Sequence, residues 1–73
     1  MTTDKVVCNL YQVRTNLGYT QQQIAKETDI HVRTIINIEK GRTTPSLLYA
    51  MKIAYFLNTP VEQLFEYKND PDI

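Results

Sequence analysis

The sequence predicts a small all-α domain of five short helices. Two observations predict it: apolar residues recur at helical spacing over short segments, and each segment is bounded by residues that typically begin or end a helix. A chain of 73 residues is long enough for one small domain. We therefore expect a single domain over residues 1–73, with a core at about residues 9–66 and a polar tail, residues 69–73, that frays.

The first two predicted helices are separated by a short turn. The first, at about Asn9–Leu17, is followed by Gly18, which provides a left-handed stop. The second opens at Thr20, a good N-cap, and Gln23 stands three residues later, which is the pattern of a capping box. Their expected buried residues are Leu10, Val13 and Leu17 in the first helix and Ile24 and Ala25 in the second.

The third predicted helix follows a break at residues 28–30 and spans about Val32–Lys40. Ile35 and Ile38 form its inner stripe, and Gly41 ends it. Because the break is only three residues long, we expect the second and third helices to pack across each other.

Threonine–proline pairs open the last two predicted helices. Thr44 is expected to cap the fourth helix, with Pro45 in its first turn. Thr59 is expected to cap the fifth helix, with Pro60 at its first position and Glu62 closing a second capping box. The apolar positions are Leu47, Leu48, Met51, Ala54 and Leu57 in the fourth helix, which stops at Asn58, and Val61, Leu64 and Phe65 in the fifth, which spans about Pro60–Glu66.

The two ends of the chain favour extended structure. Residues 5–8 ("KVVC") and 64–68 ("LFEYK") are rich in β-branched or aromatic residues. They could pair as a small two-stranded antiparallel ribbon that joins the ends of the chain. A ribbon of this kind is marginal alone in water, so it would need the helices or a second subunit behind it.

The charge balance argues against a non-specific nucleic-acid coat, which would be strongly basic. Eight Lys and Arg residues are matched by eight Asp and Glu residues, so the net charge is zero. The charges are unevenly distributed, however, with a mildly basic segment at residues 31–43 and an acidic one from residue 62 onward. This asymmetry suggests two different faces.

The composition also indicates which chemistry to exclude. Cys8 is the only cysteine, and the cysteine and histidine residues lack zinc-ligand spacing, so we expect no metal and no cofactor. Catalytic constellations and a small-molecule pocket are not indicated either, so we do not expect an enzyme. With no apolar run of ~20 residues and no secretory signal, we expect a cytoplasmic protein that does not enter a membrane.

The second and third predicted helices with their short break are the elements of a helix-turn-helix. Ala25 is small where the helices would cross, and Ile30 points inward from the turn. Packing through Ile35 and Ile38 would leave the other side of the third helix for a DNA major groove. That outer side consists of His31, Val32, Arg33, Ile36, Asn37 and Lys40.

From about Leu10 to Phe65 the sequence resembles the helix-turn-helix domain of the phage-repressor/Cro superfamily, the XRE family. The matching residues are Thr20-Gln21, Ile24-Ala25, Ile30, Ile35, Ile38-Glu39, Gly41, Pro45-Ser46-Leu47, Lys52-Ile53-Ala54 and Pro60-Val61. The resemblance implies a lambda-repressor-like fold of five helices that binds double-stranded DNA. Similarity to small dimeric repressors in this family further implies a terminal strand pair and a two-fold dimer on palindromic DNA.

Three residues depart from the family pattern. Asp29 stands where the turn often has glycine, although Asp tolerates left-handed geometry better than most residues. His31 replaces the Ser or Thr that usually caps the third helix, and Val32 replaces a residue that is commonly polar. These departures affect which DNA sequence is recognised rather than the fold.

Four residues of the third helix are candidates for contact with bases. Arg33 can bond two acceptors of one guanine, whereas the alternative is a solvated or phosphate-bound arginine. Asn37 could pair with adenine or bond a phosphate. Val32 and Ile36 could each meet a thymine methyl group or pack against a neighbouring helix.

Seven residues are candidates for phosphate contact. Gln21 begins the second helix, where free amide groups attract a phosphate, and the resemblance adds that this glutamine clamps the DNA backbone and supports the third helix. His31 is expected at the cap or facing a phosphate. The others, each of which could also be ordinary solvated surface, are Thr20, Thr34, Lys40, Arg42 and Thr43.

The resemblance also implies a structural ion pair between Arg14 and Glu39. For a homodimer, the expected seam is Val61, Leu64, Phe65 and Tyr67, with the core of the monomer as the alternative location for these side chains. We therefore expect a sequence-specific DNA-binding regulator, a repressor that binds a palindromic operator as a homodimer. The alternative is an antitoxin-like or phage-encoded interaction module in which the acidic tail or fifth helix binds a partner polypeptide.

Overall fold

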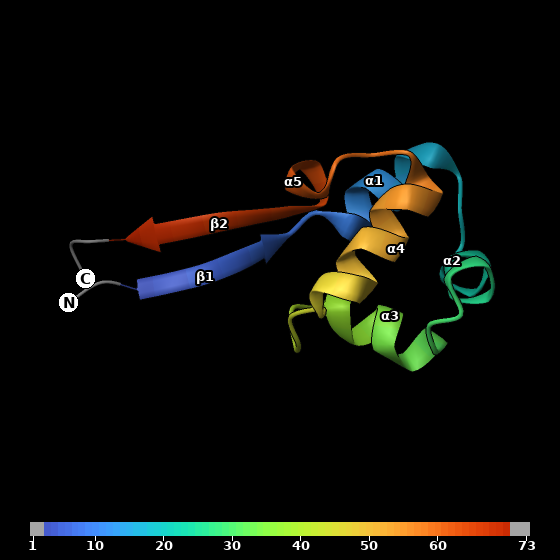
Figure 1. The fold of residues 1–73 in the computed structure, drawn as a ribbon, viewed down its shortest axis with the longest axis horizontal. Helices are drawn as coiled ribbons and strands as arrows, with labels where there is room; N and C mark the ends of the chain where they lie inside the picture. Colours follow the sequence, from blue (N-terminus) through green and yellow to red (C-terminus); the bar gives the residue numbers. More distant parts are fainter. Residues whose placement is uncertain (1–2, 71–73) are drawn as a thin grey trace.

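A computed structural model of the chain describes residues 3–70, and within them it has five helices and two strands (Figure 1). Their order is β1 (Thr3–Cys8), α1 (Leu10–Leu17), α2 (Gln21–Thr28), α3 (Val32–Glu39), α4 (Leu47–Leu57), α5 (Val61–Leu64) and β2 (Phe65–Asp70). The helices form a bundle, and β1 and β2 project from it as a ribbon, so the molecule measures 41 × 20 × 19 Å. The class is therefore a helical bundle with a ribbon rather than strictly all-α.

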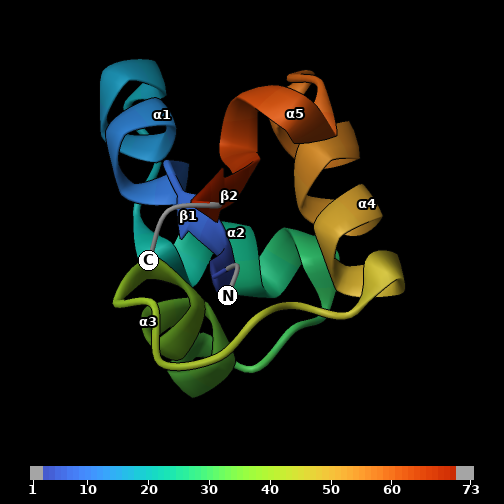
Figure 2. The ribbon, with the colours of Figure 1, turned by 90° about the vertical axis from the view of Figure 1, so that its left-hand side faces the viewer.

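The helices are arranged around a common centre when the molecule is viewed along the ribbon (Figure 2), and the core residues come from all five helices and the turn between α2 and α3. Every helix contributes to the core, which explains why such short helices are stable: packing of an apolar face, rather than helix propensity, provides most of the stability of a helix in a protein. The buried core residues are Leu10, Ile24, Ile30, Ile35, Ile38, Ile53, Ala54, Leu57 and Leu64.

The ends of α1 to α4 share one backbone arrangement. Gly18, Asp29, Gly41 and Asn58 follow the four helices with positive φ angles of 84°, 58°, 72° and 52°. The next residue then donates its N–H to a carbonyl five residues earlier, as from Arg42 to Asn37, which is the Schellman arrangement. The left-handed stops predicted at these positions, including the unusual Asp29, are confirmed.

The predicted start of α4 is wrong by two residues. Ser46, not Thr44, is the N-cap, and its hydroxyl accepts a hydrogen bond from the Tyr49 N–H at 3.1 Å. Pro45 therefore precedes the helix instead of lying in its first turn. The physical reason is that proline favours an extended conformation in the residue before it, so the chain stays extended until Ser46.

The predicted capping box of α5 is also wrong. Pro60 is the N-cap, and the Thr59 hydroxyl donates to the carbonyl of Leu57 at 3.0 Å. The helix is a single turn that ends at Leu64, because Phe65 already has extended φ and ψ angles and begins β2.

Two predicted apolar faces differ from the observed ones. Leu17 is half exposed. In α4 the buried residues are Ala50, Ile53, Ala54 and Leu57, whereas the large apolar side chains predicted to be buried there, Leu47, Leu48 and Met51, are 74%, 62% and 56% exposed. Alpha-helical geometry places these two sets on different sides of α4.

The terminal ribbon is confirmed and is longer than predicted. β1 and β2 are antiparallel, with Cys8 opposite Phe65 and Val6 opposite Tyr67. Asn9 fastens the root of the ribbon to the bundle, because its N–H donates to the Leu64 carbonyl at 2.8 Å. Residues 69–70 continue β2 instead of forming a frayed tail, and residues 71–73 of that predicted tail lie outside the described part.

Candidate nucleic-acid interface

Helices α2 and α3 pack against each other as a helix-turn-helix, with residues 29–31 as the turn. A reciprocal capping box begins α2: the Gln23 N–H donates to the Thr20 hydroxyl at 3.0 Å, and the Thr20 N–H donates to Gln23 Oε1 at 2.7 Å. Ile30 points from the turn into the core and is 2% exposed. The capping box thus fixes the start of α2, and the buried side chain of Ile30 holds the turn between α2 and α3 against the core.

Helix α3 has one buried side and one outer side. Ile35 and Ile38 are 0% and 1% exposed and join α3 to the core. On the outer side Arg33 is exposed, whereas Val32, Ile36 and Asn37 are half-buried. The four candidate base-contacting residues therefore lie on one side of α3, and this helix lies at the lower edge of the bundle in Figure 1.

His31 caps α3. Its Nδ1 accepts a hydrogen bond from the backbone N–H of Arg33 at 3.1 Å, which replaces the hydroxyl that Ser or Thr would supply. The imidazole is exposed beside the outer side of α3. The cap therefore fixes the backbone of the strongest base-contact candidate.

The ion pair expected between Arg14 and Glu39 is present, and it connects α1 with α3. Arg14 Nε donates to Glu39 Oε2 at 2.6 Å and Arg14 Nη2 donates to Oε1 at 3.1 Å. The two side chains are 10% and 4% exposed. These hydrogen bonds raise the pKa of the Arg14 guanidinium, so Arg14 keeps its positive charge.

Gln21 is joined to the same pair, which sequence reasoning did not identify. Its Nε2 donates to Glu39 Oε1 at 2.9 Å, while Arg14 Nη1 donates to the carbonyl of Tyr19 in the turn before α2 at 3.0 Å. The only indication in the sequence was the family role of this glutamine in supporting the third helix. The contact connects the first residue of α2 with the last residue of α3.

The outer surface around α3 is basic although the chain is neutral. Within residues 31–43, all of them described, Glu39 is the only acidic residue, and Arg14 neutralises it in the interior. The exposed charged residues of this segment are Arg33, Lys40 and Arg42. The Schellman bond from Arg42 to Asn37 holds Arg42 close to the end of α3.

The remaining candidates for phosphate contact lie in or next to α2 and α3 in the sequence. Thr20 and Thr43 are exposed, and Gln21 and Thr34 are half-buried. Thr20 already caps α2, so its hydroxyl has a structural function in addition to any contact with DNA.

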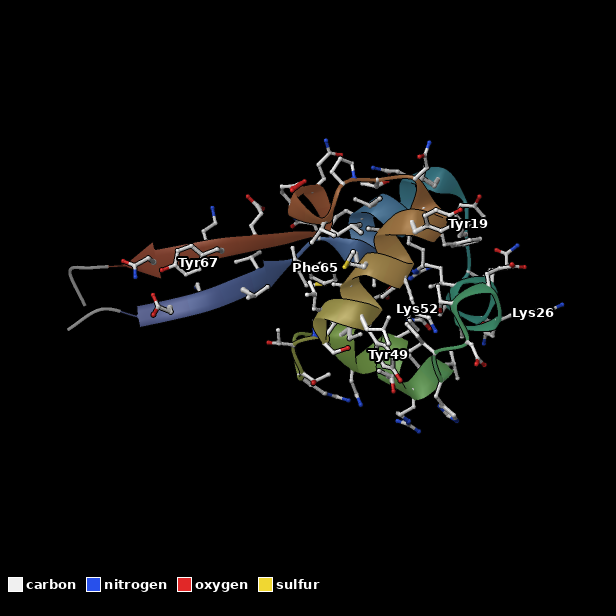
Figure 3. All side chains as sticks on the ribbon, in the orientation of Figure 1. Tyr19, Lys26, Tyr49, Lys52, Phe65 and Tyr67 are labelled. Carbon is white, nitrogen blue, oxygen red and sulfur yellow. The ribbon has the colours of Figure 1, made fainter. Side chains whose placement is uncertain are left out.

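The four residues predicted for the dimer seam are not one exposed surface. Leu64 is 0% exposed, so this assignment is wrong and the alternative location, the core, is correct. Val61 and Phe65 are half-buried against the core, and Tyr67 is 69% exposed on the ribbon, farther from the bundle than Phe65 (Figure 3).

A larger apolar surface lies on α4. Leu47, Leu48, Met51 and Tyr55 are 56–90% exposed on one side of this helix. An open groove that is lined in part by Met51, Tyr55 and Val61 connects this row with the start of α5.

Within residues 3–70, no helix is long and apolar enough to cross a membrane, and no group of His, Cys, Asp and Glu residues is placed to hold a metal ion.

Comparisons with known proteins agree with this geometry. A family model described as helix-turn-helix matches residues 10–64. The chain is similar to an HTH-type transcriptional regulator of Methanocaldococcus jannaschii, 45% identical over 51 residues, which covers 70% of this chain and 77% of the relative. It is also similar to HTH-type transcriptional regulators of Archaeoglobus fulgidus (37% over 59 residues, 81% and 84% covered) and Bacillus subtilis (33% over 54 residues, 74% and 82% covered). Because the family model and these relatives align over most of the chain, the protein belongs to the XRE family of helix-turn-helix, DNA-binding transcription regulators.

Proposed function

We propose that the protein is a repressor that binds a palindromic operator as a homodimer, with α3 of each subunit in the major groove. The observation that supports it is the division of α3 into a side held by the core and a basic outer side. A helix presented in this way fits the major groove, which is wide enough to admit it. Occupying a promoter would block transcription.

Sequence recognition is assigned to a few contacts. Arg33 bonds a guanine, Asn37 bonds an adenine or a phosphate, and Val32 and Ile36 approach thymine methyl groups. Lys40, Arg42 and Gln21 contact phosphates on either side of the groove. A neutral chain then binds DNA non-specifically only weakly, while the local basic surface still docks on the operator.

Dimerisation is assigned to the exposed row on α4 together with Val61. Four large apolar side chains in one row are more than a small monomer usually exposes as a contiguous patch. Covering this row with a second copy removes it from water. In such a dimer the two copies of α3 need a spacing of ~34 Å to reach half-sites one helical turn apart.

Selection from a pool of random double-stranded oligonucleotides, followed by sequencing, tests this function. We expect the purified protein to enrich one sequence with two inverted half-sites about 10 base pairs apart, centre to centre. Enrichment of a single half-site would contradict the dimer, and no enrichment would contradict sequence-specific binding.

Substitutions on the enriched operator test the assignment of contacts. Arg33→Ala is expected to lose about 1–3 kcal/mol of discrimination at particular base pairs. Lys40→Ala is expected to weaken binding to all sequences similarly and to reduce the slope of log K against log salt by about 1. Titrations at several salt concentrations measure both effects.

Lys26 provides the matched control. It is an exposed lysine on α2 that points away from the bundle at the end opposite the ribbon (Figure 3). Lys26→Ala should therefore keep the wild-type affinity and salt slope. Wild-type operator affinity in both Arg33→Ala and Lys40→Ala would show that the DNA-binding surface has been assigned wrongly.

A further inference from the structure

One buried carboxylate is shared between the core ion pair and a residue of the candidate DNA surface. Glu39 Oε1 accepts from Arg14 Nη2 at 3.1 Å and from Gln21 Nε2 at 2.9 Å, and Oε2 accepts from Arg14 Nε at 2.6 Å. Since the Glu39 side chain is only 4% exposed, water contributes little to its solvation. These three hydrogen bonds are therefore the main interactions that hold the carboxylate, and one of them also holds the Gln21 carboxamide.

The shared carboxylate determines which way the Gln21 carboxamide faces. An ionised carboxylate only accepts hydrogen bonds, so Gln21 must present its NH2 group to Glu39 and not its carbonyl oxygen. A side-chain amide nitrogen has two hydrogens. With one bonded to Glu39, the second is a donor whose direction is fixed by a charge in the core.

We infer that Glu39 is a positioning residue for DNA binding: it orients the Gln21 carboxamide so that its second N–H donates to an operator phosphate. This inference rests on the proposed function, in which Gln21 contacts a phosphate. The ion pair between Arg14 and Glu39 thus serves recognition as well as stability, because the carboxylate that connects α1 with α3 also orients a donor on α2.

Glu39→Gln separates this inference from simple electrostatics. The substitution removes a negative charge near the DNA, which by itself strengthens the attraction of the protein for phosphates. The new amide, however, has a single oxygen. In the place of Oε2 this oxygen still accepts from Arg14 Nε, so the NH2 group takes the place of Oε1, where it faces Arg14 Nη2 and Gln21 Nε2 and turns the Gln21 carboxamide over. Positioning therefore predicts weaker binding, whereas a purely structural glutamate predicts equal or tighter binding by the folded variant.

The test uses the selected operator with one phosphate at a time replaced by an uncharged methylphosphonate. The phosphate contacted by Gln21 is the one whose replacement weakens the wild-type protein but not Gln21→Ala. We expect Glu39→Gln to bind the intact operator about tenfold more weakly, as for one lost hydrogen bond to a charged group. We also expect it to be insensitive to replacement of that phosphate alone, while the other phosphates remain as important as in the wild type.

Two controls accompany these measurements. Gln22→Ala removes the neighbouring glutamine, which is exposed, and should leave the methylphosphonate pattern unchanged. Glu39→Asp keeps the charge but retracts the carboxylate by one methylene, so it should lose the same phosphate contact. It replaces Glu39→Gln in the test if Glu39→Gln does not fold. In the wild-type NMR spectrum, the side-chain NH2 of Gln21 should exchange with water more slowly than that of Gln22.

Each outcome decides the inference. A folded Glu39→Gln or Glu39→Asp protein with wild-type sensitivity at the Gln21 phosphate would overturn it, as would equal exchange rates for the two glutamine NH2 groups. Failure of the proposed function differs from these results, since the wild-type protein would then enrich no operator, although the slow exchange of the Gln21 amide would persist.

Discussion

At the scale of single residues, the buried ion pair of Arg14 and Glu39 connects α1 with α3. Arg14 uses all three of its nitrogens, two on Glu39 and one on the Tyr19 carbonyl, and its guanidinium lies 5.3 Å from the centre of the Tyr11 ring. A buried pair of this kind adds little net stability compared with apolar side chains of similar size. Each charge, however, needs the other as its counter-charge in the interior. Removing one partner is therefore costly.

Arg14→Met should destabilise the protein by about 3–5 kcal/mol, because the Glu39 carboxylate loses its counter-charge in the interior. That loss is comparable with the whole stability of so small a domain. Circular dichroism during urea denaturation should show a chain that is largely unfolded at 25 °C.

The double variant Arg14→Met/Glu39→Leu is the matched control. It replaces both charges with apolar side chains and should recover most of the stability lost in the single variant. A double variant as unstable as Arg14→Met would mean that the bond to Tyr19, and not the ion pair, is the main contribution of Arg14.

Cys8 predicts a dependence of stability on alkaline pH. Burial at the root of the ribbon raises the pKa of its thiol above the ordinary value of 9.0. The folded protein then holds the proton more tightly than the unfolded chain, so this stabilisation is complete below pH 9.0 and is lost as the pH rises through the pKa of the folded state. Urea denaturation between pH 8 and pH 10.5 should show a steeper loss of stability in the wild type than in Cys8→Ala.

The same burial should make the thiol react slowly. At pH 8 we expect Cys8 to react more slowly with a disulfide reagent in the native protein than in urea, because the thiolate is the reactive form. Equal rates in the two states, or identical pH profiles for the wild type and Cys8→Ala, would contradict the partial burial of the thiol.

At the scale of elements, the sequence predicted the left-handed helix ends better than the starts of α4 and α5. Gly18 and Gly41 end helices because glycine adopts positive φ without strain, and this preference is local. A start is ambiguous wherever several hydroxyl residues lie close together in the sequence, as Thr44 and Ser46 do on either side of Pro45. The choice depends on which hydroxyl the folded chain brings to a free N–H, and it is Ser46 that reaches Tyr49.

Two alanine substitutions measure this choice of cap. Ser46→Ala should cost about 1 kcal/mol of stability, because the N–H of Tyr49 loses its acceptor. Thr44→Ala should change stability by less than about 0.5 kcal/mol, as is usual at an exposed position outside such features. Denaturant midpoints of the two variants give the comparison, and a larger cost for Thr44→Ala than for Ser46→Ala would place the cap at Thr44.

The candidate site was predictable only in part, for a related reason. The helical period identified the outer side of α3, because Ile35 and Ile38 leave the opposite side free. The bond between Gln21 and Glu39 depends on how three helices are placed in space, which no local pattern contains. Most of α4 is apolar around its circumference, so periodicity could not decide which of its sides is buried.

At the scale of the whole molecule, the ribbon is held by strand pairing and the bundle by its apolar core. The composition of the two ends predicted the ribbon, and its length followed from the register between Thr3 and Asp70. The bundle buries its core without assistance, yet it leaves the α4 row exposed next to Val61. We expect that row to be where a second copy packs.

Replacing Leu48 and Met51 together with Glu should therefore convert the dimer into a monomer. Both side chains are more than half exposed, so the helical content seen by circular dichroism should not change. Sedimentation at micromolar concentration should give twice the 8.5 kDa chain mass for the wild type and a single chain mass for the variant. Operator affinity should fall by a factor of about 10²–10⁴, because the second half-site is no longer bound by a linked subunit.

Tyr67→Lys distinguishes this seam from one formed by the ribbon. Tyr67 is as exposed as the α4 row, but it lies on β2, away from the bundle (Figure 3). A dimer that packs through α4 should tolerate this change and keep both its mass and its operator affinity. If Tyr67→Lys dissociates the dimer and the α4 variant does not, the ribbon is the seam. If the wild type sediments as a monomer while still binding two half-sites, dimerisation takes place only on the DNA.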